Sequence, residues 1–171
     1  MISYLYSKKV LKKAIIKIKD ENIKSVNSLN RVVSSNIFCG TNYPTRDNAA
    51  FDGYAINSQD TKNIKKSLSK KFKIIGLIAA GNKPFKKKIK RFDAVEIMTG
   101  GIIPKGFDTI IPIEQIIFYP NESNKKYILI NKKIKKHNHV RFAGSDFKKK
   151  EIVVKKNTII QQNHILAFKT L

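Results

Sequence analysis

Cysteine is almost absent from this sequence, since Cys39 is the only one. A single cysteine excludes an internal disulfide framework and any metal site built from several cysteines. Long apolar runs are also missing, and without a stretch of about 18 apolar residues the sequence predicts no membrane-spanning helix. The N-terminal residues lack the uninterrupted apolar core and the small-residue cleavage site of a secretory signal. These absences favour a cytoplasmic protein that does not associate with a membrane.

Acidic residues are scarce: 12 Asp and Glu stand against 35 Lys and Arg, which gives a formal charge of +23. Such an excess is typical of proteins that bind nucleic acid. However, nearly all of the positive charge is lysine, whereas arginine is the residue that reads guanine and binds phosphate in a bidentate manner. The lysines also accompany abundant Ile and Asn, as A+T-rich coding would produce. We therefore expect a surface that attracts anions, without specific nucleic-acid binding.

The N-terminal segment combines apolar residues at helical spacing with lysines. The apolar positions are Leu5, Leu11, Ala14, Ile15 and Ile18. This pattern predicts an amphipathic helix over roughly residues 3–20. A basic amphipathic helix can lie on an anionic membrane, but packing on its own domain or on a partner subunit is the favoured interpretation.

From Phe72 onward the sequence has the pattern of β-strands. Short apolar runs such as FKIIGLIAAG, DAVEIMTGG, DTIIPIEQIIFY and KYILINKKI are separated by turns rich in Gly, Pro, Asn and Lys. Pro112 lies inside one run and predicts an edge strand or a bulge there. Many short strands at this spacing are typical of a barrel or sandwich. With a short helix expected in the tail, the predicted fold class is mixed α+β, mostly β.

The stretch PTRDNAAFDGYAINSQD, residues 44–60, is poor in lysine. Its Asp52-Gly53 step between apolar residues is typical of a tight hairpin, and by itself it predicts only a structural turn. However, Asp47 and Asn48 lie close by in the sequence, and a hairpin needs no such cluster. Carboxylates placed in this way could hold a hard cation such as Mg²⁺, which takes oxygen ligands and keeps several waters.

Two further loops contain glycine next to polar side chains. Thr99-Gly100-Gly101 follows an apolar run, and glycines there would let the backbone approach a ligand with its N–H groups facing an anion. It is not a Walker A loop, because the required order of glycine and lysine is absent. Gly144-Ser145-Asp146 lies between two strand-like runs. Either loop, taken alone, predicts only a turn.

His137 and His139 form an H-x-H pair in a lysine-rich loop. A zinc site needs further ligands at suitable spacing, and the sequence offers none, so both are expected to be surface residues. No arrangement of Ser, His and Asp or of Cys and His indicates nucleophilic catalysis.

Taken in order, four segments closely resemble the front part of the molybdopterin molybdenumtransferases, the MoeA and gephyrin E-domain family. The segments are DNAAFDGYAI, AAGNKP, VEIMTGGIIPKGFDTIIPIEQ and VRFAGSDFKKKEIVVKKNTI. The resemblance runs from about residue 11 to residue 171. It implies an enzyme of molybdenum cofactor biosynthesis that inserts molybdate into adenylylated molybdopterin with Mg²⁺ and releases AMP.

The resemblance also implies roles for individual residues. Asp52 would position the metal or molybdate, Thr99 would line the same cleft, and Asp146 would be a third acidic or structural contributor. Substrate contacts would come from Asn48, Gly53, Gly100 and Gly101. Three residues depart mildly from the family pattern: Ala49 and Phe51 stand where Ser and Met are common, and Ser145 takes a position that is usually Glu.

The implied architecture is an elongated, discontinuous first domain with a smaller domain inserted into it. Residues 1–43 and 141–171 would form the first domain, which links and dimerises, and residues 44–140 would form the β-rich, barrel- or sandwich-like insertion. The family's molybdopterin-binding α/β domain and its C-terminal β domain have no counterpart in this sequence. Because the family's site forms between two subunits of a homodimer, the chain is expected to supply one side of it and to be inactive alone. A separate chain is one source of the missing domains.

Two other functions fit the sequence. The first is a non-catalytic basic module that binds RNA or an anionic surface, which predicts lysines and aromatic residues gathered on one face. The second is a dimerisation partner that keeps the fold and has lost the chemistry. Substituting Asp52 in a complementation assay would separate the second from a working half-enzyme.

Overall fold

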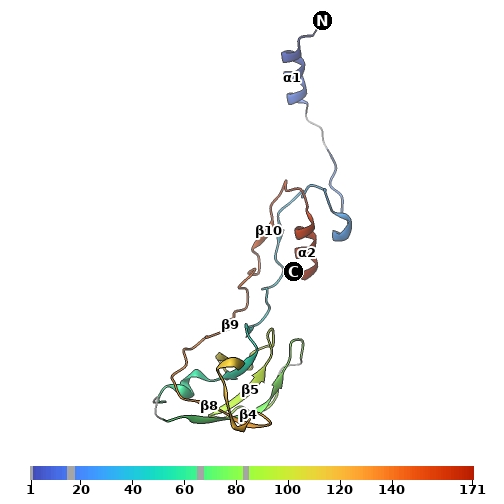
Figure 1. Cartoon of the computed structure of the whole chain (residues 1–171). Coiled ribbons are helices and arrows are strands. Elements are labelled where there is room, and N and C mark those ends of the chain that lie inside the picture. Colours follow the sequence, from blue (N-terminus) through green and yellow to red (C-terminus); the bar gives the residue numbers. More distant parts are fainter. Residues whose placement is uncertain (1, 15–17, 65–67, 83–84) are drawn as a thin grey trace. The chain divides into compact units, whose positions relative to one another are not determined.

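The structure is a computed structural model that describes residues 2–14, 18–64, 68–82 and 85–171. The chain forms two compact units: Met1–Ile37 together with Ile152–Leu171 make unit 1, and Phe38–Glu151 makes unit 2. Unit 1 therefore comes from both ends of the chain and unit 2 from its middle, as the colours of Figure 1 show. The family resemblance places the domain boundaries at 43/44 and 140/141, whereas the units divide at 37/38 and 151/152.

Unit 1 contains little regular structure around a small apolar cluster. Its elements are α1 (Tyr4–Lys13), η1 (Ser25–Asn27), β10 (Ile152–Val154) and α2 (Gln162–Thr170), and β1 (Ile37–Phe38) begins in it. Val33, Val154 and Ile160 are buried together, and Phe168 of α2 packs against them. The backbone N–H of Val33 donates to the carbonyl of Thr158 at 3.0 Å. Within the described residues, no helix has both the length and the apolar composition needed to cross a bilayer.

Helix α1 is shorter than the amphipathic pattern predicts. It ends at Lys13, Ala14 is already extended, and residues 18–20 are not helical; residues 15–17 lie outside the described part of the chain. Leu5 and Leu11 remain 77% and 72% exposed, so α1 gains no packing energy that would extend it.

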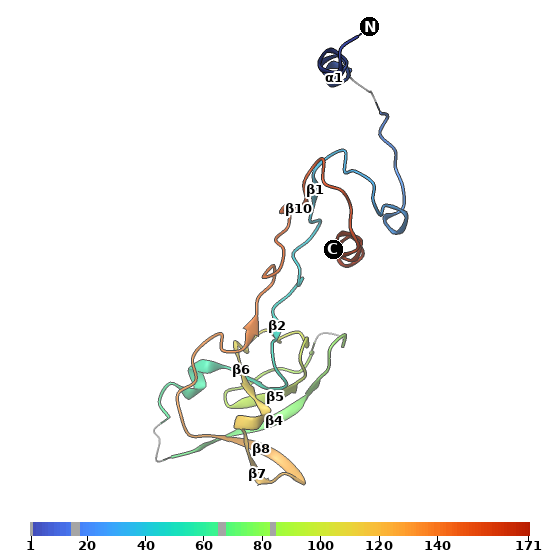
Figure 2. The same cartoon turned by 45° about the horizontal axis from the view of Figure 1, so that its top comes forward.

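Unit 2 is built on a six-stranded sheet with the order β6-β3-β5-β4-β8-β7. The strands are β3 (Gly53–Ile56), β4 (Lys70–Ile78), β5 (Asp93–Ile97), β6 (Thr109–Pro112), β7 (Ile117–Asn121) and β8 (Asn124–Ile130). Among the described strands of this sheet, only the neighbours β4 and β5 run parallel; the other neighbours are antiparallel. Figures 1 and 2 show these strands as one curved layer. Because Pro112 ends β6 at the sheet edge, the edge position predicted for it is confirmed.

The remaining elements of unit 2 are short. They are β2 (Asn48–Ala49), η2 (Ser58–Thr61), η3 (Ile113–Gln115) and β9 (Val140–Arg141). β2 pairs with β9 in an antiparallel two-stranded sheet. The overall composition of helices and strands confirms the predicted class, mixed α+β and mostly β.

The six-stranded sheet is covered with apolar residues on both faces. On β3, Tyr54 and Ile56 belong to one buried cluster and Ala55 to another, as the alternation of side chains along a strand requires. Phe72 of β4 is fully buried in the first cluster, where truncation of an aromatic ring to alanine typically costs about 3–5 kcal/mol. This two-sided core makes the sheet the rigid part of unit 2 on which the loops around Asp52 are mounted.

The Asp52-Gly53 step is not the turn of a hairpin, so the purely structural alternative that its sequence suggests does not apply. The strand before it, β2, pairs with β9, while the strand after it, β3, lies between β5 and β6. The chain therefore passes from one sheet into another at residues 50–52, and the step changes sheet rather than reversing direction within a hairpin. Because this loop connects two sheets, the side chain of Asp52 is not needed to form a hairpin turn and can make other contacts.

Candidate functional site

Three segments that are far apart in the sequence meet at β2. On one side, Asn48 pairs with Arg141 of β9. On the other side, the Ala49 N–H donates to the Gly101 carbonyl and the Gly100 N–H donates to the Ala49 carbonyl, each at 2.9 Å. β2 thus holds the glycine turn that follows β5 and the start of the 140–146 segment in one place. The three loops singled out from the sequence share this support.

Asp52 and Thr99 are joined directly. The backbone N–H and the hydroxyl Oγ1 of Thr99 both donate to Oδ1 of Asp52, each at 2.6 Å. Asp52 is exposed at the surface of unit 2. The hydroxyl bond, followed by the backbone bond, lowers the pKa of the Asp52 carboxyl below its usual value, because hydrogen bonds to the charged form favour it. The site therefore holds a fixed, ionised and accessible carboxylate at neutral pH.

Two glycines make this contact possible. Gly53 approaches β6 so closely that a Cβ atom there would lie 2.0 Å from the carbonyl oxygen of Ile111. Gly100 has a φ of +79°, a conformation that costs glycine little and other residues more. The first fixes the backbone immediately after Asp52, and the second folds the chain so that Thr99 faces it.

The glycine turn does not present its N–H groups to a ligand. The Thr99 N–H donates to Asp52, that of Gly100 to Ala49 and that of Gly101 to Met98. The expectation that these groups face an anion is wrong, because the turn closes on β2 and on itself. Its contribution to the site is to position Thr99.

Asp47 has a structural partner. Its Oδ1 accepts the N–H of Ala143 at 2.8 Å, and its carbonyl accepts the N–H of Ile103 at 3.1 Å. These two hydrogen bonds connect the segment after β9 and the segment after the glycine turn to Asp47, which directly precedes β2.

The neighbouring Asn48 has a buried Oδ1 for which the described residues supply no donor. Within the described residues, no group of three His, Cys, Asp or Glu side chains comes together to hold a metal ion.

Asp146 belongs to a neighbouring loop. Its carboxylate pairs with the guanidinium of Arg141 and accepts the Ser145 hydroxyl at 3.1 Å. The backbone of the loop is fixed by the N–H of Gly144, which donates to Pro44 at 2.9 Å, and by the N–H of Asp146, which donates to Tyr43 at 3.0 Å. No hydrogen bond among the described residues joins Asp146 to Asp52 or to Thr99.

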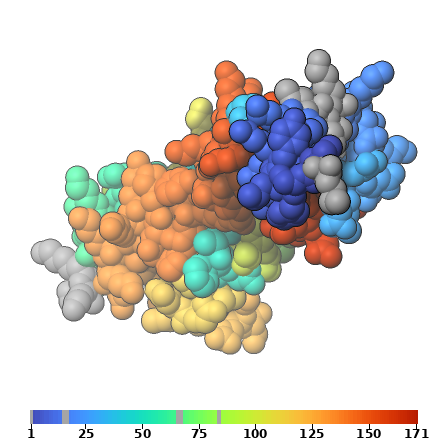
Figure 3. Space-filling view, turned by 90° about the horizontal axis from the view of Figure 1, so that it is seen from above, coloured from blue at the N-terminus to red at the C-terminus, as the bar shows by residue number. Residues whose placement is uncertain are grey.

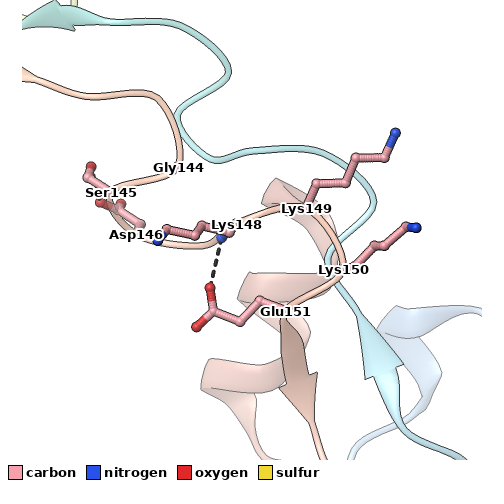
Figure 4. Close-up of a pocket in the computed structure, with 7 residues that line it drawn as sticks. All are labelled: Gly144, Ser145, Asp146, Lys148, Lys149, Lys150 and Glu151. Carbon is pink, nitrogen blue, oxygen red and sulfur yellow. Dashed lines mark hydrogen bonds between the residues drawn. The ribbon is translucent and has the colours of Figure 1, made fainter.

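A pocket of about 520 Å³ lies against this loop. Its lining residues are Gly144, Ser145, Asp146, Lys148, Lys149, Lys150 and Glu151. Figure 4 shows Lys148 directed toward Asp146, whereas Lys149 and Lys150 point away from both acids. The Lys148 N–H donates to Glu151 at 2.8 Å. The pocket is therefore lined by both signs of charge, and two of its three lysines project outward.

Sequence reasoning missed two groups near these loops. Arg141 pairs with Asp146. It is one of only four arginines and lies five positions before Asp146, at the start of a loop that contains glycine and an acid. This position is the sequence signal that could have identified Arg141 as part of the loop. Phe51 is 50% exposed next to Asp52, and its ring meets that of His139 edge-on with centroids 4.8 Å apart. No sequence pattern linked these last two residues.

The geometry allows Asp52 to act as a ligand for a hard cation. Oδ1 is occupied by two hydrogen bonds, and within the described chain no hydrogen bond is made to Oδ2. One accessible carboxylate oxygen suits Mg²⁺, which is commonly bound through one or two carboxylates and keeps several waters. This loop provides a single ionised ligand. A metal ion bound here would therefore need further ligands from a substrate or from another part of the protein.

Comparison with known proteins gives a consistent result. The sequence matches the family described as "MoeA N-terminal region (domain I and II)" over residues 3–171. It is 32% identical over 146 residues to a molybdopterin molybdenumtransferase of Haemophilus influenzae, covering 85% of this chain and 34% of that protein. It is 29% identical over 162 residues to the enzyme of the same name from Staphylococcus epidermidis, covering 95% of this chain and 37% of that protein.

Solved structures show the same similarity. The crystal structure of a molybdopterin biosynthesis MoeA protein from Pyrococcus horikoshii superposes with a TM-score of 0.85 and 28% identity, over 100% of this chain and 44% of that one. A second structure from the same source gives a TM-score of 0.83 and 27% identity, over 94% of this chain and 40% of that one. The chain spans about a third of the length of the curated relatives that it matches.

Proposed function

Because the chain belongs to the MoeA N-terminal family, we propose that it forms one side of the active site of a molybdopterin molybdenumtransferase. In this reaction molybdate is inserted into adenylylated molybdopterin and AMP is released. The observation that supports this role is the pair of 2.6 Å hydrogen bonds from Thr99 to Asp52. They join the two most specific family segments into one polar group at the surface.

Asp52 is the residue that handles charge in this proposal. Molybdate and the phosphates of the substrate are anions, and a carboxylate can share a site with them only if a cation lies between. Mg²⁺ bound at Asp52 would neutralise part of this negative charge and orient the oxyanion. Thr99 favours the ionised form of the carboxylate and holds its Oδ1 with two hydrogen bonds. Asn48, Gly53, Gly100 and Gly101 would contribute substrate contacts beside it, and Asp146 holds Arg141 at the end of β9.

We propose that residues 1–171 alone do not release AMP. The relatives that are named molybdopterin molybdenumtransferases are about three times as long as the matched segment. The described residues bring one ionised carboxylate, rather than a complete metal site, to the Asp52 loop. The remaining ligands and the pterin pocket would come from the part of the family fold that follows this segment, from the second subunit of a homodimer, or from a separate chain.

The experiment is an AMP-release assay with adenylylated molybdopterin, molybdate and Mg²⁺. Three proteins are compared: residues 1–171, the full-length Haemophilus influenzae relative, and a chimera in which residues 1–171 replace the matched segment of that relative. We expect the relative and the chimera to release AMP and the isolated chain to release none. Light scattering of the chimera reports whether it is a dimer.

Two results would count against the proposal. A chimera that is folded and dimeric but releases no AMP would show that this segment does not supply a working half of the site. AMP release by residues 1–171 alone would overturn the claim of inactivity while leaving the reaction assignment in place.

A further inference from the structure

One outer face of the unit 2 sheet combines tyrosines with lysines. In β7 and β8, Ile117 pairs with Leu129 and Tyr119 pairs with Tyr127. In β4 and β8, Lys71 pairs with Leu129 and Lys73 pairs with Tyr127. Residues two apart on a strand share a face, so the six side chains project from the same side of the sheet. This surface, the tyrosine–lysine face, comprises Lys71, Lys73, Ile117, Tyr119, Tyr127 and Leu129.

The residues between them point the other way. Phe72 and Ile128 are fully buried, and Phe118 packs against the same core cluster. In contrast, Ile117 is 58% exposed and Tyr119 is 41% exposed. None of the six residues of the face belongs to a hydrophobic cluster among the described residues. The alternation therefore divides this end of the sheet into a core side and an open side that carries large apolar and aromatic groups.

The open side carries positive charge, and its two tyrosine rings could stack against a planar group. The Nζ of Lys71 lies over the Tyr119 ring at 3.4 Å from its centroid, and the rings of Tyr119 and Tyr127 are 6.4 Å apart. The six positions include two lysines and no carboxylate. Figure 3 shows atoms of the yellow-to-orange segment, which includes β7 and β8, at the surface.

We propose that the tyrosine–lysine face binds single-stranded nucleic acid without base specificity. A base would stack on Tyr119 in place of Lys71, and the displaced ammonium would pair with an adjacent phosphate. Stacking of a base on an exposed ring is worth more than an exposed cation–π contact, so the exchange is favourable. Lysine as the only cation on the face suits contact with phosphates rather than reading of base edges.

The chemistry favours this partner over a second protein. A docked protein would need carboxylates opposite Lys71 and Lys73, whereas a nucleic acid supplies one phosphate for each stacked base. The formal charge of +23 on the whole chain adds attraction for any polyanion. Sheets that carry exposed aromatic rings are a common platform for single strands. The proposal is independent of molybdenum chemistry, since it uses none of the residues around Asp52.

The test is fluorescence anisotropy of a labelled oligouridylate of about 12 nucleotides, a length within the usual site size, titrated with the full chain. The first variant is Tyr119→Ala with Tyr127→Ala, which leaves the charge unchanged. Its matched control is Tyr4→Ala with Tyr6→Ala, which removes two exposed tyrosines from the lysine-rich α1. A second variant, Tyr119→Phe with Tyr127→Phe, keeps the rings and guards against misfolding of the alanine variant.

We expect the alanine variant of the face to bind about tenfold more weakly, and the control and the phenylalanine variant to bind like the unmodified chain. Lys71→Ala with Lys73→Ala should reduce the slope of log K against log salt concentration by about 0.7 for each phosphate that is no longer neutralised.

Equal affinities for the alanine variant of the face and the α1 control would overturn the proposal. So would equal competition by inorganic polyphosphate, because that result would mean that charge alone binds the strand. Self-association of the chain that the face variant abolishes would assign the surface to a second copy instead.

Discussion

Thr99 donates two hydrogen bonds, one from its backbone and one from its hydroxyl, to a single oxygen of Asp52. The two residues lie 47 positions apart in the sequence. One bond depends on the turn that follows β5 and the other on the identity of the side chain. This difference allows the chemical contribution of the threonine to be separated from the geometry of the loop.

Replacing Thr99 with valine should raise the pKa of Asp52 toward its usual value without restoring it fully. The hydroxyl bond is the larger cause of the lowered pKa, and the backbone bond remains in the variant. The measurement is a carbon-detected NMR titration of the Asp52 carboxyl. Thr41→Val, at an exposed threonine of the same unit, is the control. An unchanged Asp52 titration in Thr99→Val would show that the hydroxyl bond does not form in solution.

The same shift fixes the sign of a pH effect on stability. Because the folded pKa of Asp52 is lowered, its contribution is present above the unfolded value of about 3.9 and is lost as the pH falls through the folded value. Thr99→Val should therefore flatten the acid limb of the stability curve and leave the curve near neutral pH parallel to that of the unmodified chain. Urea unfolding at a series of pH values measures this, and an unchanged acid limb would contradict it.

Gly53→Ala should destabilise unit 2 by on the order of 2–3 kcal/mol, as is typical for overpacking. The added Cβ would lie 2.0 Å from the Ile111 carbonyl oxygen, and both groups belong to paired strands that cannot move apart cheaply. Gly40→Ala is the matched control, because a Cβ there meets nothing within 4 Å. Urea denaturation compares the two variants. Equal midpoints would mean that β3 and β6 separate readily at this position.

The apolar pattern carried much information about the fold and little about how strands pair. Short apolar runs located most strands of unit 2, because strands such as β5 and β6 are buried on both faces and therefore appear as nearly continuous apolar segments. Pairing of β2 with β9, across more than ninety positions, leaves no such local signal. The Asp-Gly step resembled a hairpin for this reason: turn chemistry is read locally, whereas the sheet to which each flanking strand belongs is decided by distant residues.

The candidate site was predictable in part for a related reason. Asp52 and Thr99 could be singled out because family motifs mark them, and their contact is direct. Asp47 was expected to join a cation-binding cluster because a carboxylate near another carboxylate suggests that chemistry. Its actual partner is the Ala143 N–H, a backbone group that carries no sequence signature.

Asp47→Ala should therefore expose the Ala143 amide and loosen the segment after β9. The affected bond runs from a neutral N–H to an exposed carboxylate, so we expect stability to fall by about 1 kcal/mol and hydrogen exchange at Ala143 to become faster. Asp47→Asn is the matched variant, because its Oδ1 can still accept the bond after the charge is removed. If Asp47→Asn were as damaging as Asp47→Ala, the charge rather than the hydrogen bond would be what matters at this position.

Asp52→Asn should strongly reduce the activity of the chimera without disrupting its fold. The asparagine oxygen can accept both Thr99 bonds, so the loop geometry persists while the negative charge is removed. We expect AMP release to fall by about 10²-fold or more, the scale typical for removal of one preorganised electrostatic group, while circular dichroism and light scattering show that the chimera is still folded and dimeric. Asp20→Asn removes the same charge from an exposed residue of unit 1 and should leave AMP release unaltered. If raising the Mg²⁺ concentration rescued Asp52→Asn to full activity, Asp52 would contribute only to the affinity for Mg²⁺ and would have no further part in the chemical step. If Asp52→Asn instead released AMP at the unmodified rate at every Mg²⁺ concentration, the carboxylate would have no part in the chemistry, and Thr99 would hold it in place only for the sake of the loop.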